Sequence, residues 1–230
     1  MNRISEMVTG KIMPTPGAVM EAAKLLAQEI GDLVVIDMGG ATTDVHSVTE
    51  GSDEINSILI APEPVAKRTV EGDLGLFVSA PHVIECIGKE ALSKELGFDV
   101  TGLPKNAVPT LPEEKKLVFR LAQEVVRLAV ARHAGRVKHL YGPTGRITFA
   151  EGKDLTQVKW IIGTGGFLVR WPEAKAILEE LKVQKSTELL PSKSAQVLID
   201  HDYIMSSAGL MVKKYPSQAL ALMKKSLRLN

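Results

Sequence analysis

The residues with the clearest chemical potential are two aspartates that flank a pair of glycines. Residues 33–37 form an apolar run that ends on Asp37, Gly39 and Gly40 follow, and Asp44 comes shortly after. Glycine lets a backbone turn tightly and present successive N–H groups to phosphate oxygens. A carboxylate beside such a turn suits Mg²⁺, which keeps several waters and binds through one or two carboxylates plus phosphates. The pattern fits a magnesium and phosphate site, and it fits equally well a plain β-hairpin whose aspartates cap the turn.

The elements expected to position these residues are two strands and a helix. Residues 33–37 are aliphatic without a helical period, which predicts a buried strand. Residues 45–50 alternate as a second strand does, so the glycines lie at the tip of a hairpin. Upstream, Thr15 and Pro16 are typical of a helix start, and the apolar spacing predicts an amphipathic helix over residues 17–31.

The chain after the hairpin is expected to continue with strands and then helices. Residues 55–61 and 65–70 predict two more strands, and residues from about 73 to 110 predict a small helical insertion. That insertion contains one expected helix, from Ala80 to about Gly97. A capping box formed by Thr110 and Glu113 is expected to begin the longest helix of the chain, which ends near Gly135.

A second glycine-rich turn follows another expected strand, over residues 158–162. Its residues are Gly163, Thr164, Gly165 and Gly166. Ligands bind at the carboxyl ends of strands in open parallel sheets, so both turns are expected at the same edge of one sheet. A Gly-Thr-Gly-Gly turn alone is a weak signal, and the pair of strand-to-glycine elements in this order is a considerably stronger one.

The last quarter of the chain predicts a helix over residues 172–181, a strand over 195–199 and two closing helices. Asp200, His201 and Asp202 precede the first of these closing helices, and acidic residues there are expected to cap it rather than to bind a metal. Earlier in the chain, His133 is expected to favour the carboxyl end of its helix through the helix dipole, and Cys86 to be a buried apolar residue.

Residues 37–44, DMGGATTD, resemble the second phosphate loop of the superfamily of actin, sugar kinases and heat-shock chaperones. Together with AKRTVEGDLG and IIGTGG, they make the chain similar to the glutamate mutase accessory family called MutL or GlmL, which is unrelated to mismatch-repair MutL. The resemblance extends from about Met13 to the last helix. It implies one α/β lobe of the actin-like, ribonuclease H-like ATPase fold over residues 1–230, with a mixed sheet, helices on both faces and the insertion at about 73–110. The first phosphate loop of such proteins has no match here, so this chain resembles their carboxyl-terminal half.

The resemblance also implies ATP or ADP with Mg²⁺ as cofactors. Asp37 and Asp44 are the expected catalytic carboxylates, with Asp37 holding Mg²⁺ through water. The expected nucleotide-binding residues are Gly39, Gly40, Ala41, Thr42, Thr43, Lys67, Arg68, Glu71, Gly163, Thr164, Gly165 and Gly166. Among these, adjacent charges at a strand end are more often simply solvated, which weakens the assignment of Lys67, Arg68 and Glu71.

The function implied by the resemblance is that of a reactivating factor for an adenosylcobalamin-dependent mutase, either glutamate mutase or an aminomutase. ATP hydrolysis would drive exchange of inactive cobalamin, with the mutase subunit and the missing amino-terminal lobe as partners. Two alternatives stay open: a non-catalytic interaction module with the same fold, and a fragment of a small-molecule kinase. An activator of a dehydratase would need paired cysteines for an iron–sulfur cluster, and this chain has a single cysteine.

Composition excludes several other classes of protein. The 28 basic and 27 acidic residues balance to a net charge of +1, so nothing indicates nucleic acid or an anionic membrane as a partner. The single cysteine excludes a disulfide framework within the chain and favours the reducing cytoplasm. No apolar run is long enough to span a membrane.

Overall fold

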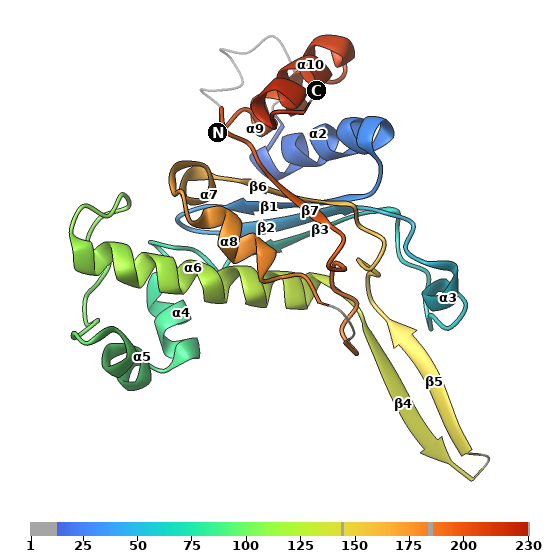
Figure 1. Cartoon of the computed structure of the whole chain (residues 1–230), viewed down its shortest axis with the longest axis horizontal. Coiled ribbons are helices and arrows are strands. Elements are labelled where there is room, and N and C mark those ends of the chain that lie inside the picture. Colours follow the sequence, from blue (N-terminus) through green and yellow to red (C-terminus); the bar gives the residue numbers. More distant parts are fainter. Residues whose placement is uncertain (1–12, 144, 184–185, 230) are drawn as a thin grey trace.

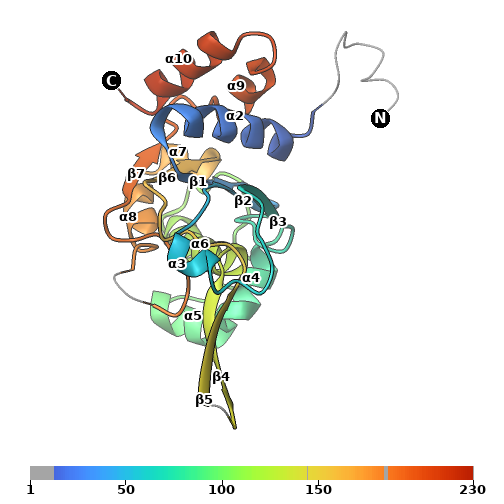
Figure 2. The ribbon, with the colours of Figure 1, turned by 90° about the vertical axis from the view of Figure 1, so that its right-hand side faces the viewer.

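A computed structural model describes residues 13–143, 145–183 and 186–229, and shows a mixed five-stranded sheet between two layers of helices (Figures 1 and 2). The polar lead before Met13 lies outside the described residues. This arrangement confirms the expected α/β class with a mixed sheet and helices on both of its faces. None of the described helices has the length and apolar character needed to cross a membrane.

The central sheet has the strand order β3-β2-β1-β6-β7. Its strands are β1 (Leu33–Met38), β2 (Thr43–Val48), β3 (Ala66–Glu71), β6 (Trp160–Thr164) and β7 (Gln196–Ile199). Strand β2 is antiparallel to both of its neighbours, whereas β1, β6 and β7 run parallel. Strand β1 is at the centre and is buried on both faces, which explains its almost continuous aliphatic sequence.

One face of the sheet is covered by α2 (Thr15–Ile30), α9 (Met205–Met211) and α10 (Pro216–Ser226) (Figure 1). The core there combines Val19 and Leu26 of α2 with Leu33 and Val35 of β1. Helix α2 begins after Pro14, so Thr15 is a helical residue and not the cap that the sequence predicts.

The opposite face is covered by α6 (Pro112–His133), with α4 (Ala80–Ile87), α5 (Lys89–Leu96), α7 (Gly166–Arg170) and α8 (Ala174–Glu179) around it. The expected single helix over 80–97 is wrong, because Gly88 adopts φ = 94° and separates α4 from α5. The expected capping box is also wrong: Leu111 precedes α6, and no side chain caps its first turn.

Two segments of the chain differ most from the prediction. The expected strand over 55–61 is wrong, because the hydroxyl of Ser52 accepts a hydrogen bond from the Ile55 N–H and starts a short helix, α3 (Asp53–Asn56). Only a single-residue bridge between Leu59 and Ala150 remains of it. Beyond the elements predicted above, the chain also forms a protruding hairpin of β4 (Arg136–Gly142) and β5 (Gly145–Glu151) (Figure 1).

A buried lysine joins the base of this hairpin to the central sheet. Lys153 is 2% exposed, and its ammonium donates to the carbonyl oxygens of Thr49 at 2.7 Å, Pro64 at 2.6 Å and Val65 at 3.2 Å. These carbonyls belong to the end of β2 and the approach to β3. The Lys153 ammonium therefore holds together the two ends of the connection between β2 and β3.

Replacement of Lys153 with methionine is expected to lower the free energy of unfolding by about 2 kcal/mol, because three carbonyls lose a charged donor while the apolar stem is retained. Urea denaturation measures this loss. Lys138→Met is the matched control, because Lys138 is a partly exposed lysine that contacts only Glu151. Equal stability of the Lys153 variant and the parent would show that the ammonium does not hold this connection.

Candidate functional site

The two predicted aspartates lie side by side at the carboxyl end of β1. Asp37 is directly opposite Asp44 of β2 and in register with Thr164 of β6. Paired positions of neighbouring strands share a face of the sheet, so these three side chains point toward the same side, that of α2 and α9. The hairpin and the second glycine turn thus lie at the carboxyl ends of neighbouring parallel strands, as the sequence predicts.

The electrostatic environment of this pair is unfavourable to two negative charges. Burial, together with the nearby charges of Asp44 and Asp200, raises the pKa of Asp37 to about 6. Burial also raises the pKa of Asp44 to about 6, against the lowering effect of Arg68. One carboxylate oxygen of Asp44 and the hydroxyl of Thr43 are buried without a hydrogen-bond partner in the described part of the chain. A cation at this position would offset these costs.

Asp200 completes the acidic cluster but is already committed to the structure. Its carboxylate accepts hydrogen bonds from the Thr164 hydroxyl at 2.9 Å and the Met205 N–H at 3.0 Å, and from Ser226. The expected capping role is therefore confirmed for Asp200. The described residues contain no group of three or more His, Cys, Asp or Glu arranged to hold a metal ion. A single carboxylate with waters and phosphates, the arrangement typical of Mg²⁺, needs no such group.

The first glycine turn binds the rest of the fold through its carbonyl groups and not through most of its N–H groups. Its carbonyl groups are used: those of Gly39 and Gly40 accept from the N–H groups of residues 76–78, and the carbonyl of Ala41 accepts from the Ser79 hydroxyl at 2.7 Å. The backbone N–H groups of Gly40, Ala41 and Thr42, in contrast, donate no hydrogen bond within the described residues. These free donors point to a phosphate or another anion as their partner.

The second glycine turn packs directly against the first strand. Gly165 has φ = 95°, and a Cβ there would lie 2.3 Å from the carbonyl oxygen of Met38, so only glycine allows this approach. Gly166 has open space beside it. Gly163, in contrast, is buried among Leu178, Ile199 and Leu168, which gives it a packing role.

Both turns open into a cavity of about 220 Å³. Its lining includes Gly39 and Gly40 from the first turn, Gly166 from the second, and the side chains of Arg170 and Tyr203. Tyr203 has a left-handed backbone, with φ = 51°, and burial together with the charge of Asp37 raises its pKa. The sequence offers no signal for Arg170 or Tyr203, because neither belongs to a recognisable motif.

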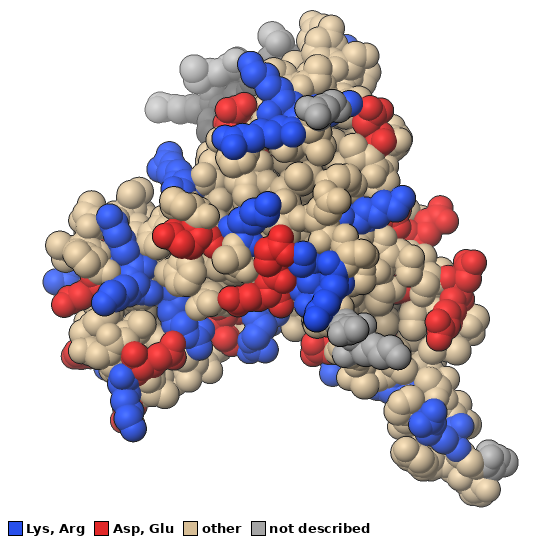
Figure 3. All heavy atoms as spheres, viewed as in Figure 1, with Lys and Arg blue, Asp and Glu red and all other residues tan. Residues whose placement is uncertain are grey.

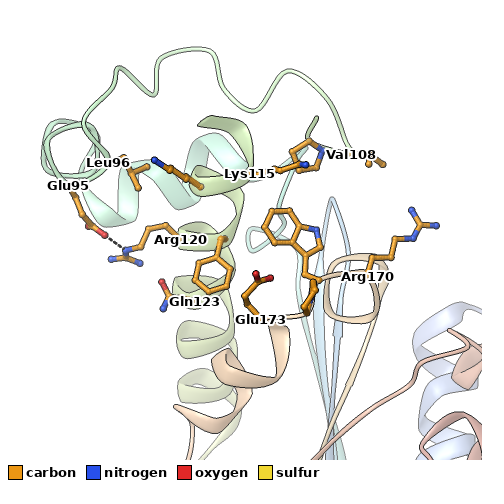
Figure 4. Close-up of a pocket in the computed structure, with 13 residues that line it drawn as sticks. Glu95, Leu96, Val108, Lys115, Arg120, Gln123, Arg170 and Glu173 are labelled. Carbon is orange, nitrogen blue, oxygen red and sulfur yellow. Dashed lines mark hydrogen bonds and ion pairs between the residues drawn. The ribbon is translucent and has the colours of Figure 1, made fainter. Parts of the chain in front are cut away.

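A larger groove of about 670 Å³ continues from this cavity between α5, α6 and the segment from Arg170 to Glu173 (Figure 4). The two spaces share Arg170 and Trp171 in their walls. The Trp171 ring stacks on Phe119 with a centroid distance of 6.4 Å and contacts Phe167 at 4.6 Å. A flat aromatic wall with cationic side chains around it suits a planar, polar ring such as a nucleobase.

The three remaining predicted residues are charged side chains of β3. Lys67 lies in the same cross-strand row as Val34, on the face of the sheet opposite to the aspartates. Its ammonium forms an ion pair with Glu63 at 3.0 Å. Glu71 accepts from Arg132 at 2.7 Å. Arg68 is exposed on β3, close enough to lower the pKa of Asp44. The structure therefore brings Arg68 near the site, leaves Lys67 away from it and occupies Glu71 with another partner.

Two residues outside the site differ from their predicted roles. His133 is fully buried, with ring nitrogens 2.8 Å from the Ser47 hydroxyl and 3.0 Å from the Thr69 hydroxyl. Burial lowers its pKa to about 3, so the ring is neutral at pH 7 and joins α6 to the sheet without a charge on the helix end. Cys86 is exposed, contrary to the expected buried position.

Replacement of Asp37 with asparagine is expected to stabilise the fold by about 1 to 2 kcal/mol at pH 8, because a two-unit rise in pKa costs stability whenever the carboxylate is charged. The Asp37 carboxyl stays protonated up to about pH 6 in the folded protein, whereas it loses its proton near pH 4 in the unfolded chain. The stabilisation by Asp37→Asn should therefore fade as the pH falls from about 6 to about 4. Urea denaturation at pH 8 and pH 4 measures it, with the exposed Asp202→Asn as control. A gain independent of pH would contradict the electrostatic origin.

Comparison with known proteins places the chain in a family. The model of the family described as MutL protein matches residues 1–227. The chain is 39% identical over 246 aligned positions to Protein MutL of Clostridium tetanomorphum, and the alignment covers 99% of this chain and 53% of that relative. The chain thus spans about half the length of the curated relative it matches. It belongs to the MutL family, as the phosphate-loop and glycine motifs indicated.

Proposed function

We propose that this chain is the nucleotide-binding lobe of an accessory factor that serves a cobalamin-dependent mutase. The observation that supports it most is the meeting of two glycine turns at the end of β1, next to the paired residues Asp37 and Asp44, with both turns lining one cavity. The ligand is ATP or ADP with Mg²⁺. The fold proposed is the actin-like lobe, which the sheet order and the helices on both faces support.

The proposed position of the nucleotide follows from the free polar groups. The phosphates accept hydrogen bonds from the N–H groups of Gly40, Ala41 and Thr42, with the Thr43 hydroxyl nearby. Asp37 holds Mg²⁺ through water, and Asp37 or Asp44 orients the water that attacks the terminal phosphate. Positioning of this kind, with charge stabilisation by the metal, provides most of the acceleration in phosphoryl transfer.

The nucleoside lies farther along the same edge of the sheet. The open side of Gly166 contacts the sugar, and the base enters the groove against Trp171. Arg170 lies where the cavity meets the groove and can reach either phosphate or base (Figure 4). This placement uses the glycine residues for close approach and the aromatic wall for stacking.

The biological role proposed is exchange of inactive cobalamin on a mutase, glutamate mutase or an aminomutase, coupled to ATP hydrolysis. Membership of the MutL family supports a partnership of this kind. Closure of two lobes around the nucleotide would supply the movement, and a second lobe outside this chain would be needed for it. The proposed location is the cytoplasm, in keeping with the free, exposed Cys86.

Tryptophan fluorescence offers a direct test of the nucleotide site. The chain has two tryptophans. Trp171 lines the groove. Trp160 lies in β6 and donates its indole N–H to the Ile30 carbonyl at 2.9 Å. Titration with Mg-ADP is expected to change the emission of Trp160→Phe, which keeps only the groove tryptophan. The emission of Trp171→Phe is expected to stay constant.

The outcomes of this titration separate the alternatives. A saturable change carried by Trp171 alone supports the proposed site. A constant signal in both variants would oppose it and leave a non-catalytic interaction module, or a site that needs the second lobe. Phosphorylation of an added metabolite by the protein joined to its second lobe would indicate a kinase instead.

A further inference from the structure

The outer edge of the central sheet presents an unoccupied strand beside a cationic cleft. Strand β7 is at one end of the strand order and pairs only with β6 among the described strands (Figure 2). A cleft of about 520 Å³ lies along it, between the segment from Leu168 to Lys175 and the end of α10 at Leu227 and Arg228. This cleft is separate from the cavity beside the two glycine turns, although Arg170 and Trp171 belong to the walls of both.

The backbone of β7 still has hydrogen-bonding groups to offer. The N–H groups of Gln196 and Asp200 donate to Lys159 and Gly163, toward β6. Successive residues of a strand alternate in direction, so the groups of Val197 and Ile199 point away from β6. The carbonyl of Ile199 accepts from the His201 N–H, whereas both groups of Val197 and the N–H of Ile199 have no partner in the described chain.

The charged side chains that line this cleft have one sign. Arg170, Lys175 and Arg228 line it together with His201, all four are exposed, and no aspartate or glutamate lines it. None of the three arginine and lysine side chains forms an ion pair within the described residues. Elsewhere on the face shown in Figure 3, basic and acidic side chains are interspersed. The cleft is therefore a local cationic site on a nearly neutral protein.

Arg228 occupies a backbone position that favours glycine. It has φ = 56°, and the bonds from Arg228 N–H to Lys225 and from Leu229 N–H to Lys224 close α10 in the manner of a Schellman motif. An arginine there costs stability relative to glycine. Its presence is explained if the guanidinium is needed in the cleft.

We propose that β7 and this cleft bind an acidic, extended segment of a partner protein, which adds to the sheet as a sixth strand. The backbone groups of Val197 and Ile199 pair with the segment, and the cations beside them select acidic side chains on it. The unpaired strand edge favours a peptide over a free phosphate, because phosphate would use the cations and leave the edge unpaired. This inference does not depend on the nucleotide site.

Fluorescence anisotropy of a labelled peptide tests the proposal. The probe alternates glutamate with valine, and it is compared with one that alternates lysine with valine and with one methylated on every amide nitrogen, which blocks both edges of the strand. The acidic peptide is expected to bind, the basic peptide to bind at least about 10-fold more weakly, and the methylated peptide to lose binding. Arg170 is left unchanged, because it also lines the nucleotide cavity.

Charge reversal at two exposed positions provides the matched variants. Lys175→Glu with Arg228→Glu is expected to weaken the acidic peptide at least about 10-fold, whereas Lys213→Glu with Lys214→Glu, which changes net charge equally on another surface, is expected to leave binding unchanged. Equal weakening by both pairs would overturn the proposal in favour of nonspecific attraction. Two results would overturn strand addition in favour of an anion site. One is undiminished binding of the methylated peptide, and the other is displacement of the acidic peptide by inorganic phosphate alone.

Discussion

Replacement of Gly209 with alanine is expected to destabilise the protein by at least about 3 kcal/mol, near the upper end for overpacking of a buried site. Helices α2 and α9 touch at this residue, and a Cβ there would lie 1.8 Å from the carbonyl oxygen of Ala18. That oxygen is part of the α2 backbone and cannot rotate away, so the helices must separate. Urea denaturation of the variant measures the loss.

Ser207→Ala is the control for this variant, because Ser207 lies on the exposed side of the same helix. It is expected to change stability by less than about 0.5 kcal/mol. If Gly209→Ala were as stable as this control, α2 and α9 would not be in the close contact described. Since α2 also packs on β1 through Leu26 and Leu33, a loosened α2 is expected to weaken support for the end of β1 as well.

The sequence predicted the parts of the site that depend on local pattern. The aliphatic run over β1, the turn at Gly39 and Gly40 and the second turn at Gly165 are each encoded by neighbouring residues. The run of small residues from Ser206 to Gly209 is likewise a local pattern, and the structure places Gly209 at a close contact between α2 and α9.

The sequence did not predict features that arise from long-range contacts. Trp171, Arg170 and Tyr203 reach the cavity because α7 and the segment after β7 fold back over the first turn. The buried contacts of Lys153 join segments about 90 to 100 residues apart and carry no local pattern. The wrong strand over 55–61 reflects a competition that Ser52 decides, because its side chain starts a helix where the β-branched residues alone favour a strand.

Stabilisation of the folded chain by bound nucleotide is expected to require Asp37. A ligand that binds only the folded state adds RT ln(1 + [L]/Kd), which is about 2.7 kcal/mol at a concentration one hundred times Kd. Removal of the carboxylate that holds Mg²⁺ should abolish most of this gain, whereas the variant without ligand should remain folded, since the raised pKa shows that the charge costs stability. The effect on the ligand response and the effect on intrinsic stability are thus expected to have opposite signs.

Thermal unfolding with and without Mg-ADP, on the parent, Asp37→Ala and the exposed control Asp202→Ala, tests the nucleotide site most directly. The expected result for the parent and the control is a rise in Tm of about 5 to 10 °C, which corresponds to about 2.7 kcal/mol. Almost no rise is expected for Asp37→Ala. An equal rise in all three proteins would contradict the role of Asp37. No rise in the parent would contradict nucleotide binding by this chain alone.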